Sequence, residues 1–278
     1  MRKLLLFLPV LFLTFNSSSQ VVLPLKERVS AIEDIQKDRL ENLLPKLMKR
    51  EKIDCWIIIT REYNEDPVIK SLLPPTWLNA RRRTILVFTL NESSNKVDMA
   101  AITRYSFGNL IKSVWDKEKE PNQMKALVDY LSLKNPKKIG INISKIYGIA
   151  DGLSVTDNNL LMSYLPKSLE SKVVSAEPLA VSWIETRTEK EMILFSHLTE
   201  ITHNIIKEAF STSVITPGVT TTDDVVWWMR EKVSSMGLKT WFHPTIDVQR
   251  ADDSDLYAFD AKQKFDVIKP GDLVHCDF

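Results

Sequence analysis

The sequence contains little glycine and little cysteine, with seven and two residues respectively among 278. Loops that cradle a phosphate need several closely spaced glycines, and neither the P-loop sequence nor the G-x-G-x-x-G turn occurs. The G-x-S-x-G sequence that surrounds a nucleophilic serine in many hydrolases is also absent. These absences exclude the common nucleotide-binding and serine-hydrolase functions.

Cysteine is too scarce to form a disulfide framework. Cys55 and Cys276 each lie in an apolar, strand-like run, which predicts that both are small buried side chains. A single disulfide between them is the alternative.

Long hydrophobic runs are missing too, apart from Leu4–Phe15 at the amino terminus. Arg2 and Lys3 precede this run, and the polar cluster Asn16–Ser19 follows it. A helix that spans a bilayer needs about 20 apolar residues, whereas this order of segments is typical of a secretory signal peptide. Residues 1–19 are therefore predicted to direct export to the periplasm or out of the cell. An uncleaved amino-terminal anchor is the alternative.

Neither sign of charge dominates the sequence. The net charge is +1, and removal of residues 1–19, which contain two basic and no acidic residues, leaves 35 basic against 36 acidic residues. Nucleic-acid binding usually requires a clear basic excess. We therefore expect no nucleic-acid partner, and no stable membrane insertion once the signal peptide is removed.

What the sequence does contain is an alternation of helical and strand patterns up to about residue 175. Ala31–Glu51 has apolar residues at helical spacing, with a break predicted at Pro45. Ile53–Thr60 is a continuous apolar run that predicts a strand buried on both faces. Other predicted strands are Thr84–Leu90, Val97–Thr103, Lys138–Ile143 and Lys172–Val174, and other predicted helices are Met124–Leu133 and Asn158–Leu165. The alternation predicts an α/β amino-terminal domain at residues 20–180.

Long helices replace this pattern after Pro178–Trp183, which is predicted to be the joint to a second domain, residues 181–278. Thr188 and Glu191 form a capping box that begins a helix, and this helix ends before Pro217–Gly218.

The rest of the second domain is predicted to end in a strand that carries an acid. The remaining elements are a helix from Thr221 or Thr222 to Gly237, a strand at Trp241–Val248 and a polar loop at Ala251–Lys269. Lys269–Asp272 is a turn into the final strand, which contains Asp277. The chain stops at Phe278 without a turn residue, so the fold is expected to continue beyond this point.

Three segments of the second domain follow one another in a specific order: Trp183–Glu191, Thr216–Thr220 and Ile268–Phe278. Together they resemble the catalytic domain of the creatinase, prolidase and methionine-aminopeptidase family, the pita-bread metallopeptidases. The α/β segment before them resembles the non-catalytic amino-terminal domain of Xaa-Pro aminopeptidases and creatinases. The resemblance implies a creatinase-like α/β domain followed by an incomplete α+β pita-bread domain.

The resemblance also implies a metal site. Asp277 matches the first ligand of the family's two-metal centre, and two divalent ions, above all Mn²⁺, suit carboxylate oxygen. The complete protein is expected to remove amino-terminal residues from its peptide substrates. The family's other ligands, a second Asp, a His and two Glu, match positions after Phe278. The chain as given is therefore expected to be inactive.

One feature departs from the family's pattern. Its peptidases carry a histidine in the loop before the metal-bearing strand, and no histidine occurs between Ala251 and Lys269. His243, just upstream, is the substitute candidate for substrate binding. His275 shares a strand face with Asp277 and is interpreted as a neighbour of the site. Two alternatives stay open: a non-catalytic homologue that binds peptide or protein, and a metal-free, creatinase-like C–N hydrolase.

A run of arginines stands out in the first domain. Arg81–Arg83 follow Pro74–Pro75 and Trp77, ahead of a predicted strand. Arginine forks suit carboxylates, so the run could contact a substrate carboxylate or a partner subunit of a homo-oligomer. An exposed strand start is the alternative.

Overall fold

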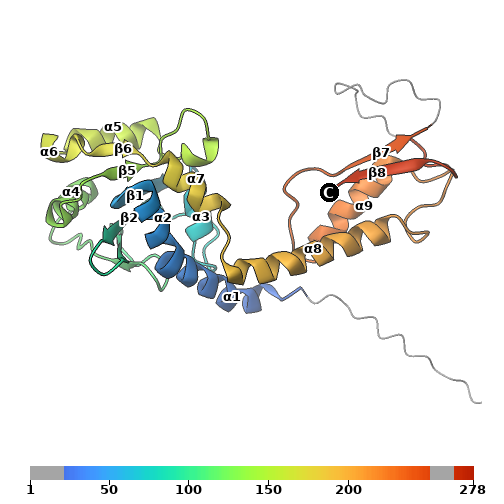
Figure 1. Cartoon of the computed structure of the whole chain (residues 1–278), viewed down its shortest axis with the longest axis horizontal. Coiled ribbons are helices and arrows are strands. Elements are labelled where there is room, and N and C mark those ends of the chain that lie inside the picture. The colour runs from blue at the N-terminus through green and yellow to red at the C-terminus, as the bar shows by residue number, and fades with distance from the viewer. Residues whose placement is uncertain (1–21, 251–265) are drawn as a thin grey trace, which may run out of the picture. The chain divides into compact units, whose positions relative to one another are not determined.

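The computed structural model describes residues 22–250 and 266–278, which form two compact units (Figure 1). The amino-terminal unit is Leu25–His197. The carboxy-terminal unit consists of residues 22–24, 198–250 and 266–278. Within the described ranges, no helix is long and apolar enough to cross a membrane.

The amino-terminal unit contains a mixed six-stranded sheet with the strand order β4-β3-β2-β1-β5-β6. Strand β1 pairs antiparallel with β2 and parallel with β5, and β3 pairs antiparallel with β2. The strands are β1 (Cys55–Arg61), β2 (Arg83–Asn91), β3 (Lys96–Ala101), β4 (Lys112–Ser113), β5 (Ile139–Ile141) and β6 (Val173–Ser175).

Helices cover both faces of this sheet (Figure 1). One face packs against α2 (Leu44–Glu51), α3 (Pro67–Leu72) and α7 (Glu177–Glu185). The other packs against α4 (Gln123–Lys134), α5 (Val155–Tyr164) and α6 (Lys167–Glu170). Helix α1 (Leu25–Asp38) precedes α2.

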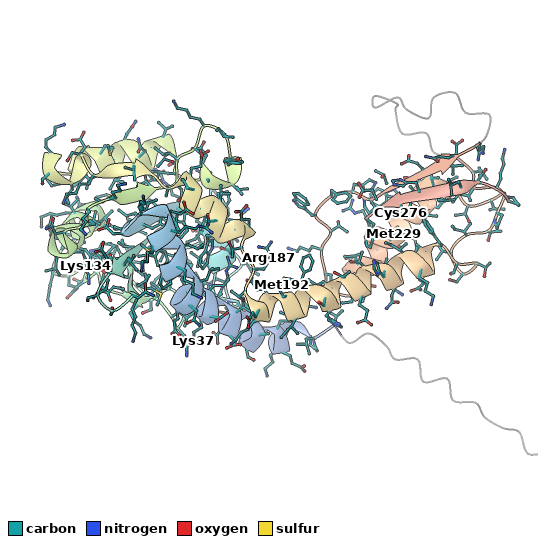
Figure 2. The ribbon with its side chains drawn as sticks, in the orientation of Figure 1. Lys37, Lys134, Arg187, Met192, Met229 and Cys276 are labelled. Carbon is teal, nitrogen blue, oxygen red and sulfur yellow. The ribbon has the colours of Figure 1, made fainter. Side chains whose placement is uncertain are left out.

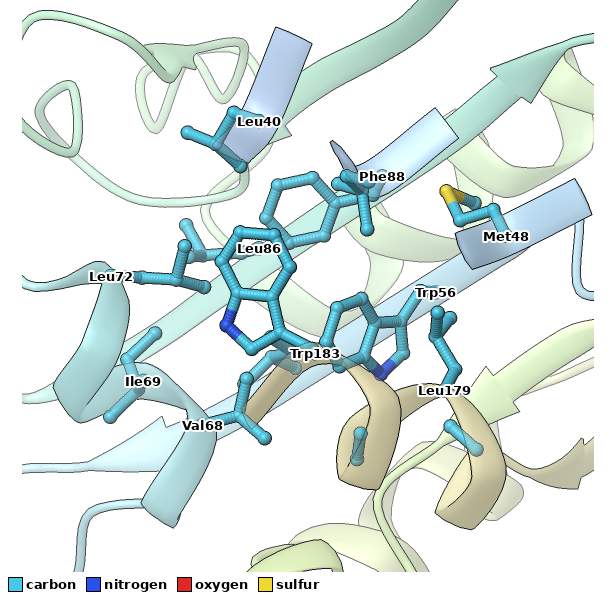
Figure 3. Close-up of a cluster of buried hydrophobic side chains, with 14 of the residues drawn as sticks. Leu40, Met48, Trp56, Val68, Ile69, Leu72, Leu86, Phe88, Leu179 and Trp183 are labelled. Carbon is cyan, nitrogen blue, oxygen red and sulfur yellow. The ribbon is translucent and has the colours of Figure 1, made fainter. Parts of the chain in front are cut away.

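The period-two alternation of β1 divides its side chains between the two cores. Trp56 and Ile58 point to the α7 side, where Trp183 packs against Trp56 at 6.3 Å between ring centroids (Figure 3). Ile57 and Ile59 point to the α4 side. Because every residue of β1 except Arg61 is buried, the predicted strand with two buried faces is confirmed.

The segment predicted to be the joint, Pro178–Trp183, lies within helix α7. Pro178 lies in the first turn, where a helix needs no backbone N–H. Trp183 is only 1% exposed, and its Nε1 donates to Ser71 Oγ at 2.8 Å. The compact unit therefore continues to His197, past the predicted boundary at residue 180.

The helix predicted at residues 31–51 is interrupted earlier than expected. A π-helical segment, Arg39–Leu43, separates α1 from α2, and Pro45 lies in the first turn of α2. The Leu44 amide donates to the Arg39 carbonyl, five residues back. A proline ring clashes with the carbonyl four residues before it, and the widened turn gives that carbonyl room.

The carboxy-terminal unit packs two helices against a two-stranded sheet. Its elements are α8 (Glu189–Ala209, which begins in the other unit), α9 (Thr222–Ser235), β7 (Thr245–Gln249) and β8 (Leu273–Asp277). Met229 of α9 is fully buried in its core, and Cys276 of β8 packs against this core; Figure 2 labels both.

The predicted starts of α8 and α9 and the predicted end of α9 are confirmed. The Glu191 carboxylate accepts from the Thr188 amide at 2.8 Å, and the Thr188 hydroxyl accepts from the Glu191 amide. Thr221 and Asp224 form a second capping box at α9. Gly237 follows α9 with φ +65°, a left-handed conformation that glycine adopts without steric cost.

Both cysteines are free thiols, so the disulfide alternative is wrong. Cys55, the first residue of β1, is fully buried in the core on the α4 side of the sheet. This burial raises the pKa of its thiol to about 12. Cys276 is half-buried in the carboxy-terminal unit.

A buried chain of hydrogen bonds runs from β1 to α3. Trp56 Nε1 donates to Asn142 Oδ1 at 2.7 Å, and Asn142 Nδ2 donates to Asp66 Oδ2 at 2.9 Å. Asp66 Oδ1 accepts from the Val68 amide, which caps α3. No ion pair reaches Asp66 within the described ranges, and burial raises the pKa of its carboxyl above the ordinary value of 3.8.

This raised pKa predicts a pH dependence of stability. The folded protein holds the Asp66 proton more tightly than the unfolded chain, so the stability from this proton is complete below pH 3.8. It is lost as the pH rises through the folded-state pKa. Asp66→Asn cannot titrate, and its amide would face the Asn142 amide, donor to donor. We expect the variant to be less stable than the wild type at low pH, with the difference narrowing as the pH rises.

Urea titrations from about pH 3.5 to pH 7 would measure this difference. Glu41→Gln, at an exposed carboxyl, is the control and should differ little from the wild type at every pH. A constant difference between the wild type and Asp66→Asn would show that Asp66 has the same pKa in the folded and unfolded states.

Candidate metal-ligand face of the carboxy-terminal strands

Asp277 lies on the face of the β7–β8 pair that points away from the helices. Val274, Cys276 and Phe278 pack against the core formed with α8 and α9, while Leu273, His275 and Asp277 alternate with them and are exposed. In the structure the strand is apolar on one face only, so the Asp277 carboxylate stays accessible to solvent and to a ligand.

The turn before β8 is held by a bidentate ion pair. The guanidinium of Arg250, at the end of β7, donates to both carboxylate oxygens of Asp272 at 2.9 Å. The same guanidinium donates to the Val267 carbonyl, and Asp272 also accepts from the Lys269 amide. The hydrogen bonds from Arg250 are the main cause that lowers the pKa of Asp272. This pair fixes where β8 begins and, through its register, where Asp277 lies.

The link between α8 and α9 lies beside the segment that leads into β8. The Gly218 amide donates to the Ile268 carbonyl at 2.7 Å, and the Ile268 amide donates to the Thr220 carbonyl at 3.0 Å. Gly218 has φ +82°, which a side chain would oppose. Two of the three segments that carry the family resemblance, Thr216–Thr220 and Ile268–Phe278, are therefore in direct contact.

Other potential donors on this face come from the paired strand. In the antiparallel register Asp277 lies opposite Thr245, and His275 lies opposite Asp247. His275 Nδ1 is 3.9 Å from Asp247 Oδ2, and both side chains are more than half exposed. Sequence reasoning missed Asp247, although an acid at alternating strand spacing could have indicated it.

The donor set is incomplete for a metal pair. No group of three or more His, Cys, Asp or Glu side chains that could hold a metal occurs in residues 22–250 and 266–278. Asp277 alone supplies one carboxylate, whereas a pair of ions requires several donors. The residues that the structure describes therefore do not by themselves fit a two-metal centre.

His243 is engaged by α9. The strand predicted at Trp241–Val248 begins only at Thr245, so His243 lies in the preceding loop, directly before Pro244, which has no N–H for strand pairing. The always-charged Arg230 donates from Nη1 to His243 Nδ1 at 3.2 Å. The imidazole packs edge-on to the Trp227 ring, with 5.2 Å between the two ring centroids.

The structure thus brings some predicted site residues together and leaves others apart. His275 shares the exposed face with Asp277, as predicted. No hydrogen bond among the described residues joins His243 to Asp277. The loop without histidine, predicted at Ala251–Lys269, falls mostly on residues 251–265, which lie outside the described residues.

Two solved structures are similar to this chain. An X-Pro aminopeptidase from Thermotoga maritima MSB8 aligns with a TM-score of 0.50 and 14% identity, over 84% of this chain and 60% of that protein. A Xaa-Pro dipeptidase from Bacillus anthracis aligns with a TM-score of 0.45 and 13% identity, over 90% of this chain and 59% of that protein. The chain has the fold of an X-Pro aminopeptidase.

The similarity to the X-Pro aminopeptidase confirms the predicted fold class, a creatinase-like α/β domain followed by an α+β pita-bread part. At 14% identity it concerns the fold, and the chain spans about three fifths of the length of either protein. No protein-family model matches the sequence, and no curated protein matches it.

Proposed function

We propose that this chain is part of an exported, metal-dependent aminopeptidase that removes the amino-terminal residue of peptides, as Xaa-Pro aminopeptidases do. The observation that supports this proposal is the position of Asp277. It lies on the exposed face of β8, in a chain whose fold is that of an X-Pro aminopeptidase. An acid at this place can ligate a divalent ion without leaving the strand.

Asp277 would provide one ligand of the metal pair, and further ligands would come from chain beyond Phe278. When bound, two such ions would supply an activated water and a polarised peptide carbonyl. Hard ions such as Mn²⁺ suit a carboxylate donor. Residues 20–278 alone, whose described part holds no group of three or more potential ligands, are expected not to hydrolyse peptides.

The proposal includes the cellular location and the binding partners of the protein. Residues 1–19 would be a signal peptide, so that the enzyme acts in the periplasm or outside the cell. Its partner would be a peptide substrate, in a homo-oligomer of the mature chain.

The test is to express the complete reading frame that contains residues 20–278 and to assay it on Xaa-Pro peptides with and without Mn²⁺. Asp277→Asn is expected to lower kcat/KM by at least about a hundredfold and to lower the Mn²⁺ bound per chain, measured by elemental analysis. Glu231→Gln, at an exposed carboxyl of α9, is the control and should keep both. Full activity and metal content in Asp277→Asn, or hydrolysis by residues 20–278 alone, would contradict the proposal.

A second function is favoured by one observation, the absence of histidine between Ala251 and Lys269. It is peptide binding without catalysis, or metal-free C–N hydrolysis of a creatinase-like kind. The same preparations separate the two proposals. A complete protein that binds no Mn²⁺ but retains peptide, or cleaves a small amidine, would support the second.

A further inference from the structure

A surface of the amino-terminal unit combines exposed arginines with aromatic and aliphatic side chains. It lies where the turn after β1, the segment before β2 and the turn after β3 meet. We call it the arginine–aromatic patch, and it consists of Tyr63, Trp77, Leu78, Arg81, Arg82, Arg104 and Tyr105.

The guanidinium of Arg81 is held in place by two rings. Its Cζ atom lies 4.2 Å from the centroid of Trp77 and 5.5 Å from that of Tyr105. The two rings meet edge to face at 6.2 Å, and Trp77 also contacts the buried Phe107 at 5.2 Å. A guanidinium stacked by its face keeps the N–H groups at its edge, where they can donate to a carboxylate.

The patch carries more positive than negative charge: the carboxylates of Glu62 and Glu65 lie at its edge, where they accept from the backbone amides of Arg82 and Tyr63 at 3.3 Å, against three guanidinium groups. Arg81, Arg82 and Arg104 are exposed and take part in no ion pair within the described residues. Two neighbouring arginines differ in this respect. Arg61 and Arg83, paired across β1 and β2, share the buried carboxylate of Asp157 at 2.7 and 3.1 Å. The charges of Arg61 and Arg83 are therefore paired, whereas the three exposed arginines of the patch can still pair with a ligand.

Apolar side chains lie exposed beside these charges. Leu78 is 91% exposed and Tyr63 is 88% exposed. Tyr63 and Arg82 both have left-handed backbone conformations, at φ +68° and +52°. A hydrogen bond of 2.7 Å from the Glu62 amide to the Arg82 carbonyl ties the two turns together. Left-handed conformations cost about 1 kcal/mol or more for such residues, and both side chains are exposed.

We propose that the arginine–aromatic patch binds an acidic segment of another protein. Its carboxylates would accept from Arg81, Arg82 and Arg104, and an apolar side chain between them would pack on Leu78 and Tyr63. Arginine and aromatic residues are the side chains that dominate binding at protein interfaces. A nucleic acid fits less well, because Arg81 already covers the Trp77 ring on which a base would stack and the net charge of the chain is only +1. This inference goes beyond the proposed peptidase function and does not depend on it.

The test uses residues 20–278 and a fluorescein-labelled peptide with two glutamates on each side of a leucine. Fluorescence anisotropy at roughly 50 mM salt should show saturable binding to the wild type, with Kd below about 1 mM. Arg81→Glu/Arg82→Glu should weaken binding at least about tenfold. Arg81→Lys keeps the charge but loses the planar fork, and should weaken binding by a smaller factor.

The matched control is Lys46→Glu/Lys145→Glu, which changes the charge equally at exposed lysines outside the patch. Circular dichroism establishes that all variants are folded. The proposal is overturned if the wild type does not bind the peptide, or if the control weakens binding as much as the patch variant. It is also overturned if the patch variant abolishes self-association in sedimentation, or oligo(dT) binding, and leaves peptide binding unchanged.

Discussion

Replacing Arg39 by methionine is expected to lower the free energy of unfolding of the amino-terminal unit by about 3 kcal/mol. Arg39 lies at the π-helical segment between α1 and α2 and is only 5% exposed. Methionine has a similar length and an apolar stem, so it can fill the space. The loss therefore reports the charge and hydrogen bonds of the guanidinium and not its volume.

The reason for this large effect is the number of groups that depend on the guanidinium. Nη1 donates to the Thr186 carbonyl at 2.8 Å and to the Glu191 carboxylate at 2.7 Å, while Nη2 donates to the Trp183 carbonyl. Its Cζ also lies 4.3 Å from the Trp183 ring. Without Arg39, the last carbonyls of α7 lose their donors and Glu191, 20% exposed, loses its counter-charge.

Urea denaturation followed by tryptophan fluorescence would measure the change. Lys37→Met is the matched control, because Lys37 lies in α1, two residues before Arg39, and is exposed (Figure 2). It should stay within about 0.5 kcal/mol of the wild type. If the two variants have equal free energies of unfolding, the hydrogen bonds and the ion pair of the Arg39 guanidinium do not contribute to stability.

Local patterns were sufficient to predict much of the fold. The unbroken apolar run of β1 identified a central strand, and the Thr188–Glu191 box identified the start of α8 to the residue. These features depend on residues close together in the sequence. The burial of Trp183 within helix α7 was not predicted, because it depends on contacts with Trp56 and Ser71, which lie far away in the sequence.

The candidate site was predictable to the same extent. Alternation along β8 and the family resemblance were enough to place Asp277 on a strand, and His275 on the same face. The exposure of that face was not predictable, because it depends on which side of the β7–β8 pair the two helices cover. The Arg250–Asp272 pair that positions β8 also joins residues with a loop between them, and no short-range pattern indicates such a pair.

Gly152→Ala is expected to destabilise the amino-terminal unit by roughly 3 kcal/mol, although alanine adds a single methyl group. A Cβ atom at Gly152 would lie 2.2 Å from both Cγ and Oδ2 of Asp66, and 2.8 Å from the Asp66 Cα. Such distances are far inside van der Waals contact, so either the loop or α3 has to move.

Asp66 cannot yield without breaking the buried chain of hydrogen bonds. Its carboxylate accepts from Asn142 and from the Val68 amide, and its own amide donates to the Thr60 hydroxyl at 2.8 Å. Displacing Asp66 by about 1 Å would leave a buried carboxylate without donors, which costs more than the overpacking itself. Asn142 would lose its acceptor at the same time.

A matched glycine lies four residues upstream. Gly148 has no atom within 4 Å of its Cβ position, so Gly148→Ala should leave the free energy of unfolding within about 0.5 kcal/mol of the wild type. Comparing the two alanine variants by urea denaturation removes the effect of glycine on the unfolded chain, because both lose the same backbone freedom. If the two variants have equal stability, Asp66 is not packed against this loop in the folded protein. A loss confined to Gly152→Ala means that the loop and the buried carboxylate hold each other in place.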